Sequence, residues 1–191
     1  MKQTKHLWLA LLLITATNTS TTLAGRLAPQ KPDDAAAYYR LGLEHYKAGR
    51  HLAAIEAYCQ AVQLKPDFAA AHNNLGYVYD ELGKYQDALK SYERALRLRP
   101  DDAVTHTNLA VTYRKLGQYQ KAVEACRQAI SLQPDLAEAH NNLGVAFYKM
   151  NRYKEAIEEY EQAIRLKDDY AEAHFSLGIA QLAAKDCELN N

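Results

Sequence analysis

The chain has 191 residues, enough for one domain, and its 48% hydrophobic and 24% charged residues are ordinary for a folded protein. Lysine plus arginine and aspartate plus glutamate both total 23, so no net charge attracts nucleic acid or an anionic membrane. This balance argues against a nucleic-acid-binding role.

Residues 1–24 differ in composition from the rest of the chain. Two lysines precede an apolar run over residues 7–14, and small and hydroxylated residues follow up to Ala24. This is the order of regions in a secretory signal peptide, and the run is far shorter than the ~20 residues of a membrane span. We expect cleavage after Ala24, a chain exported to the periplasm or secreted, and no stable membrane span. An uncleaved anchor or a buried N-terminal helix is the alternative.

Residues 69–102 set the pattern for most of the remaining sequence. The unit contains two segments of helical apolar periodicity, joined at Gly83 and closed by Pro100. Self-similarity at a period of 34 residues is typical of stacked helical hairpins, so we expect an all-α solenoid. The expected copies are residues 35–68, 69–102, 103–136 and 137–170, with a partial copy, one capping helix, at 171–184.

Each unit carries the same residue types at the same positions, counted from its first residue. Small residues at positions 8, 20 and 27 let two helix backbones approach closely. Position 24 is tyrosine except at Cys126, which we expect to be a buried free thiol. Position 15 holds residues that accept a left-handed conformation after a helix, namely Gly49, Gly83, Gly117 and Asn151. Asp33 or Asp34 is expected to cap the first helix, and the aspartates at position 33 are expected to cap the following helices; they are Asp67, Asp101, Asp135 and Asp169.

These positions resemble the pattern of tetratricopeptide repeats (TPRs) over residues 35–184. The resemblance implies a right-handed α-solenoid of antiparallel helix-turn-helix repeats whose first helices line a concave groove. It also implies a non-enzymatic scaffold or assembly factor with a protein or peptide partner. At the flanks we expect a linker at 25–34 and a polar tail at 185–191.

Asparagine occupies position 6 in three successive units, where the resemblance implies that side chains face the groove. An amide offers both a donor and an acceptor, so it can hold the backbone of an extended peptide. The row is similar to the asparagine ladder in the TPR domain of O-linked N-acetylglucosamine transferase. An ordinary solvated face is the alternative. The expected groove residues are Arg40, Asn74, Tyr77, Asn108, Arg114, Lys115, Asn142, Tyr148 and Lys149.

A chaperone-binding subclass of the family uses a lysine, asparagine and arginine clamp for two carboxylates. Of the corresponding positions only Asn74 matches, because the others hold Tyr39, Leu43, Val104 and Asn108. A chaperone C-terminus is therefore not the expected ligand.

Histidine recurs at position 4, but successive layers would place the rings ~10 Å apart, too far for one metal ion. No phosphate-binding loop, zinc-protease motif or nucleophile elbow is present. We therefore expect no catalysis, no cofactor and no metal. The four histidines are His72, His106, His140 and His174.

The last expected helix lacks charge over residues 175–184, although a terminal cap normally presents a polar outer face. Either a partner or sister chain covers it, or its short side chains make exposure tolerable. Self-association through residues 171–184 is thus the alternative to peptide binding.

Overall fold

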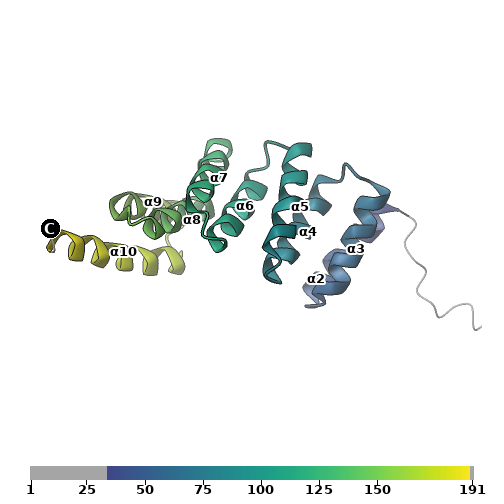
Figure 1. Cartoon of the computed structure of the whole chain (residues 1–191), viewed down its shortest axis with the longest axis horizontal. Helices are drawn as coiled ribbons and strands as arrows, with labels where there is room; N and C mark the ends of the chain where they lie inside the picture. Colours follow the sequence, from purple (N-terminus) through teal and green to yellow (C-terminus); the bar gives the residue numbers. More distant parts are fainter. Residues whose placement is uncertain (1–33, 190–191) are drawn as a thin grey trace, which may run out of the picture. The chain divides into compact units, whose positions relative to one another are not determined.

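The computed structural model describes residues 34–189, and this part of the chain is entirely α-helix and turn. Figure 1 shows the helices following one another as hairpins in sequence order. The expected leader at 1–24 and nearly all of the linker at 25–34 lie outside the described residues. The helices are α2 (Ala35–Lys47), α3 (His51–Leu64), α4 (Ala69–Glu81), α5 (Tyr85–Leu98), α6 (Ala103–Lys115), α7 (Tyr119–Leu132), α8 (Ala137–Lys149), α9 (Tyr153–Leu166) and α10 (Ala171–Leu189).

The helix starts repeat with the period of the sequence. The first helices of the units begin at Ala35, Ala69, Ala103, Ala137 and Ala171, and the second helices at His51, Tyr85, Tyr119 and Tyr153. The all-α solenoid expected from the repeat is therefore confirmed.

The turn inside each hairpin depends on a left-handed residue at position 15. Gly49, Gly83 and Gly117 have φ of 70°, 71° and 71°, and Asn151 has φ of 59°. Only glycine and, less readily, asparagine adopt this backbone at low cost. The prediction for position 15 is confirmed.

The cap expected at Asp33 or Asp34 is found at Asp34, whereas the caps expected at position 33 of the units were placed wrongly. Asp34 and Asp102 cap α2 and α6, and their carboxylates accept from the backbone N–H groups of Ala37 and Thr105. Phe68 and Leu136 stand at the corresponding positions before α4 and α8, which have no side-chain cap. The cap is the residue directly before each first helix, so the aspartates at position 33 lie one residue too early.

The last helix also departs from expectation. α10 continues beyond Ala184 to Leu189, so most of the expected polar tail is helical. Lys185 and the four residues that follow it form the final turn of this helix. The outer surface of α10 is correspondingly longer than that of the helix expected over residues 171–184.

In three of the four hairpins, a tyrosine ring of the second helix packs directly against a glycine of the first helix. Tyr58, Tyr92 and Tyr160 are at most 2% exposed. A Cβ atom added at the facing glycine would lie 2.5 Å from the Tyr58 ring and 2.8 Å from the Tyr92 and Tyr160 rings. The glycines are Gly42, Gly76 and Gly144.

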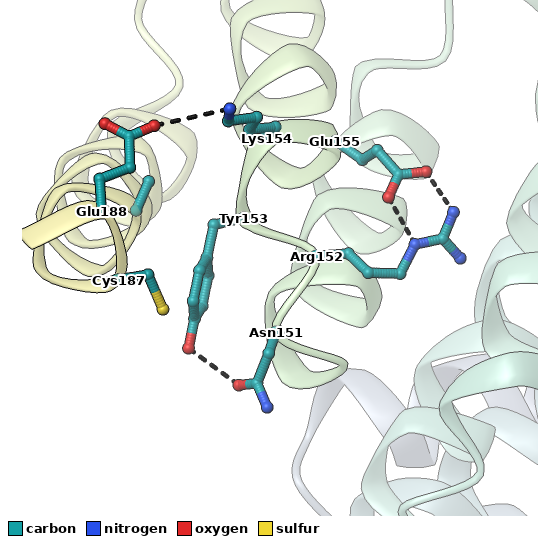
Figure 2. A pocket seen from close by; sticks show the side chains of 8 residues that line it. Asn151, Arg152, Tyr153, Lys154, Glu155, Cys187 and Glu188 are labelled. Atoms are coloured by element: carbon teal, nitrogen blue, oxygen red, sulfur yellow. Dashed lines mark hydrogen bonds and ion pairs between the residues drawn. The ribbon is translucent and has the colours of Figure 1, made fainter. Parts of the chain in front are cut away.

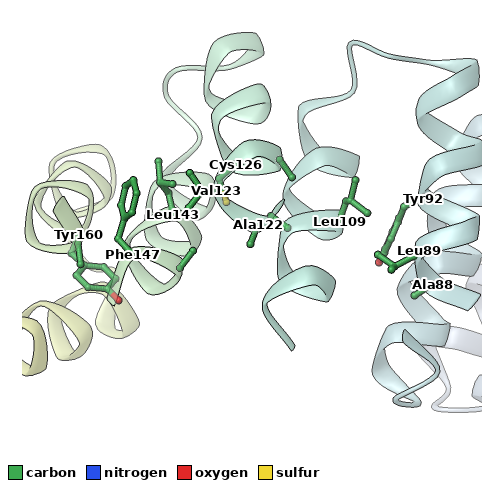
Figure 3. Close-up of a cluster of buried hydrophobic side chains, with 14 of the residues drawn as sticks. Ala88, Leu89, Tyr92, Leu109, Ala122, Val123, Cys126, Leu143, Phe147 and Tyr160 are labelled. Atoms are coloured by element: carbon green, nitrogen blue, oxygen red, sulfur yellow. The ribbon is translucent and has the colours of Figure 1, made fainter. Parts of the chain in front are cut away.

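The third hairpin carries a different pair at these positions. Ala110 replaces the glycine and Cys126 replaces the tyrosine, and both are buried in the large core that extends from α5 to α10 (Figure 3). The methyl group of Ala110 thus fits because the facing Cys126 side chain is much smaller than a tyrosine. Burial raises the pKa of Cys126 to about 12, so this free thiol stays protonated at neutral pH, and the prediction of a buried free thiol is confirmed.

The recurring histidines link each first helix to the turn before it. In every case Nε2 lies within hydrogen-bond distance of the backbone carbonyl six residues earlier, at 2.8–3.1 Å; the acceptors are Pro66, Pro100, Pro134 and Asp168. His140 additionally contacts Glu159, with Nδ1 and Oε2 2.7 Å apart, and this carboxylate raises the pKa of His140. The recurrence therefore has a structural cause.

Candidate functional site

A pocket of about 330 Å³ opens on the face formed by the first helices of three successive repeats. We call it the tyrosine pocket. Every lining residue except Tyr58 belongs to α2, α4 or α6. The lining consists of Leu43, Tyr46, Tyr58, Asn74, Tyr77, Val78, Val104 and Asn108.

Aromatic rings form one wall of the tyrosine pocket. Tyr46 and Tyr77 meet edge to face, with ring centroids 5.7 Å apart. Burial raises the pKa of Tyr58 to about 12, and burial together with Tyr77 and Glu81 raises the pKa of Tyr46. These phenols therefore remain protonated at neutral pH and can donate hydrogen bonds. Tyr77 is 39% exposed, so part of this wall is open to a ligand.

Two of the expected asparagines belong to a polar network between repeats. Asn74 Nδ2 donates to Tyr39 Oη at 3.0 Å, and Asn108 Nδ2 donates to Asn73 Oδ1 at 3.3 Å. The same Asn73 oxygen accepts from Thr105 Oγ1 at 3.0 Å, and Asn73 Nδ2 donates to Asn74 Oδ1 at 3.3 Å. Thr105 was not among the residues expected on this face. The sequence does mark this residue, because position 3 is alanine in every other unit.

The third asparagine is held differently. Asn142 Nδ2 donates to the Glu138 carbonyl of its own helix at 2.8 Å. The three amides at position 6 thus do not form a row of equivalent groups. Asn74 and Asn108 lie in the tyrosine pocket, and Asn142 lies outside it.

The expected cations of the groove have different environments. Lys115 forms an ion pair with the buried carboxylate of Asp80, which also accepts from Thr112 Oγ1 at 2.7 Å. Its ammonium group is thus already neutralised. Arg40 is exposed on α2, outside the pocket lining. Arg114 is half-buried, and its Nε has no hydrogen-bond partner.

The last two expected residues lie together on α8. The ammonium group of Lys149 stands 5.9 Å from the ring centroid of Tyr148. Lys149 is exposed and Tyr148 is half-buried. Both lie one repeat beyond the tyrosine pocket, so the structure does not gather all of the expected residues into one cavity.

A second pocket, of about 320 Å³, lies between the start of α9 and the end of α10 (Figure 2). Lys154 and Glu188 form an ion pair across it at 3.5 Å, and Arg152 pairs with Glu155. Tyr153 Oη donates to Asn151 Oδ1 at 2.8 Å. The charged groups that line this pocket therefore already have partners, in contrast to Arg114.

Between residues 34 and 189, no three or more histidine, cysteine or acidic side chains gather as they would around a metal ion. In the same part of the chain, no helix has the length and apolar character needed to cross a membrane.

Comparison with known proteins agrees with this architecture. Family models described as tetratricopeptide repeat match residues 101–169 and 69–102, and one described as TPR repeat matches residues 42–83. The second of these matches covers the same residues as the unit that sets the repeat pattern. A comparison with curated proteins gives no match.

Solved structures share the fold. A MamA protein superposes with a TM-score of 0.72 at 26% identity, covering 79% of this chain and 82% of that chain. The first TPR of Spaghetti (RPAP3), bound to the HSP90 peptide SRMEEVD, superposes with a TM-score of 0.60 at 26% identity, covering 61% and 93%. YrrB, described as a TPR protein with an unusual peptide-binding site, has a TM-score of 0.67 at 22% identity, covering 80% and 78%, and shows the fold alone. With family models spanning residues 42–169 and TPR proteins as structural neighbours, the chain belongs to the tetratricopeptide repeat family.

Proposed function

We propose that the chain is a non-enzymatic scaffold that binds a segment of another protein on its first-helix face. The tyrosine pocket is the observation that carries this proposal, because three repeats contribute open apolar and aromatic surface to one cavity. Val104 is 53% exposed and Tyr77 39% exposed at its mouth. Exposed aromatic and aliphatic side chains around a concavity are typical of binding surfaces.

The bound segment would place an apolar side chain in the tyrosine pocket and its backbone beside the amides of Asn74 and Asn108. Their own network leaves Asn108 Oδ1 as an acceptor for a peptide N–H group. The RPAP3 domain holds a peptide on the same fold. The carboxylate clamp is absent from this sequence, so the proposed ligand is not of the HSP90 type.

The proposed scaffold acts in the cell envelope or the secretory space, as a periplasmic or secreted protein. This part rests on residues 1–24, whose basic, apolar and small-residue regions follow the order of a signal peptide. Sequencing the N-terminus of the chain recovered from an expressing cell tests it. A start at Gly25 is expected, and a start at Met1 would contradict cleavage.

Val104→Asp is expected to abolish peptide binding without unfolding the protein. The variant adds a carboxylate to the apolar mouth of the tyrosine pocket at a side chain that is already solvated. The probe is a peptide selected from a random twelve-residue display library on the purified chain, with affinity measured by fluorescence anisotropy. We expect binding at least about tenfold weaker, equivalent to ~1.4 kcal/mol.

Leu52→Asp is the matched control, since Leu52 is 71% exposed on α3 and lies outside the pocket. This variant should bind the selected peptide as the unmodified chain does. Failure to select any peptide, or equal binding by Val104→Asp, would refute the proposal.

A second candidate function, self-association, is favoured by the outer face of α10. Six exposed residues on it follow a spacing that alternates between four and three, the spacing of a coiled-coil seam. Phe175, Leu182 and Leu189 are 71%, 68% and 75% exposed. The seam consists of Ala171, Phe175, Gly178, Leu182, Lys185 and Leu189. A second copy of α10 presents the same pattern, so the seam is self-complementary.

Sedimentation at micromolar concentration distinguishes this candidate. A dimer is expected that Leu182→Glu converts to a monomer, because the substitution places a charge in the seam and leaves the fold intact. Leu52→Glu, at an equally exposed leucine of α3, should remain dimeric. A monomeric unmodified chain would exclude self-association.

A further inference from the structure

The ends of the first helices are joined by a ladder of side-chain pairs in which residue n meets residue n+35. On the first rung, Tyr46 Oη donates to Glu81 Oε1 at 3.3 Å. On the second rung, Asp80 forms its ion pair with Lys115. Each pair connects one repeat to the next with complementary chemistry.

The third rung breaks this rule. The residues at its two positions are Arg114 of α6 and Lys149 of α8, and two cations cannot neutralise each other. The second rung is completed by the hydroxyl of Thr112, whereas the equivalent residue on the third rung is Ala146, which has no polar side chain. The third rung therefore lacks both the carboxylate and the hydroxyl that complete the second.

Arg114 is correspondingly left without a partner. Its Nε is buried and makes no hydrogen bond, and no ion pair within residues 34–189 includes Arg114 or Lys149. A half-buried guanidinium group without a counter-ion is unfavourable, and a carboxylate matches its planar set of donors. Lys149 supplies a second positive charge at the exposed side of the same rung.

We propose that Arg114 and Lys149 form a carboxylate subsite that takes an aspartate or glutamate side chain of the bound segment. The inference rests on the proposed peptide-binding function and gives its ligand a chemical class. Arg114 lies six residues beyond Asn108 of the tyrosine pocket on α6, a rise of about 9 Å. At about 3.3 Å per extended residue, the acidic side chain stands about three residues from the apolar one. The ligand is thus an acidic–apolar segment.

The test measures the coupling between the two cations and the ligand carboxylate. Peptides selected on the unmodified chain are synthesised with amidated C-termini, each in its acidic form and with the acid replaced by its amide. The acidic form should bind about tenfold more tightly to the unmodified chain. This preference should disappear in R114Q/K149Q, while the amide peptide binds both proteins equally.

K90Q/R97Q is the control, because it removes the same charge from two exposed side chains of α5. Its preference for the acidic peptide should be unchanged. Lys149→Gln alone, at an exposed residue, keeps the test valid if Arg114→Gln lowers the melting temperature, and it should reduce the preference at least about threefold.

Peptides that are selected without any preference for an acid would overturn this inference and leave the proposed function intact. An acid preference that persists in R114Q/K149Q would overturn it in the same way. If no peptide is selected at all, both the inference and the proposed function fail.

Discussion

Gly76→Leu is expected to lower the free energy of unfolding by about 1–3 kcal/mol or more, as overpacked core substitutions do. A Cβ atom at this position would already lie 2.8 Å from the Tyr92 ring, before the rest of the leucine side chain is added. Tyr92 is 1% exposed, so its ring is enclosed by the core. Urea unfolding followed by circular dichroism measures the change.

Gly178 provides the matched control at the same position of the fifth, partial unit. Within residues 34–189 no second helix packs on α10 from its own unit, and a Cβ atom here would have no neighbour within 4 Å. Gly178→Ala should therefore raise stability by about 0.5–1 kcal/mol through helix propensity alone, and Gly76→Ala should lower it. If the two alanine variants behave alike, the glycine–tyrosine contact does not determine the packing of the hairpin.

Cys126→Tyr is expected to destabilise the third hairpin by about 1–3 kcal/mol, although tyrosine is the residue at this position in the other three. The ring seats on a glycine in those hairpins, whereas here the facing residue is Ala110, which is 1% exposed. The double variant A110G/C126Y recreates the pair of the other hairpins and should recover much of the loss.

A double-mutant cycle on these two positions isolates their interaction. We expect a coupling free energy of about 1 kcal/mol or more, after allowance for the lower helix propensity of glycine in A110G. Strictly additive effects of the two substitutions would show that position 8 and position 24 vary independently.

Much of the scaffold was predictable because its signals are local and repeated. The 34-residue period gave the helix starts, and the left-handed conformation of Gly83 and Asn151 follows from which residues tolerate positive φ. The caps were less predictable, because Asp101 and Asp102 are both suitable residues and the exact helix start decides between them.

The candidate site was only partly predictable. The repeat places Asn74, Tyr77 and Asn108 on one face, and the structure brings them into one pocket. Whether Asn74 reaches Tyr39 depends on the angle between successive hairpins, which no local pattern contains. Lys115 was expected to face a ligand, but it pairs with Asp80 of the preceding repeat. A contact between repeats of this kind does not follow from the residue pattern within one unit.

The separation between ladder and core has a consequence for how such an array can acquire new specificity. The rungs join residues n and n+35 at the ends of the first helices, whereas the glycine–tyrosine seats lie inside each hairpin. Exchanging a rung therefore changes the chemistry offered where two successive repeats meet, while the packing inside each hairpin stays the same. Each rung is thus a unit of recognition shared by two repeats, and a new preference can be built one rung at a time on an unchanged frame.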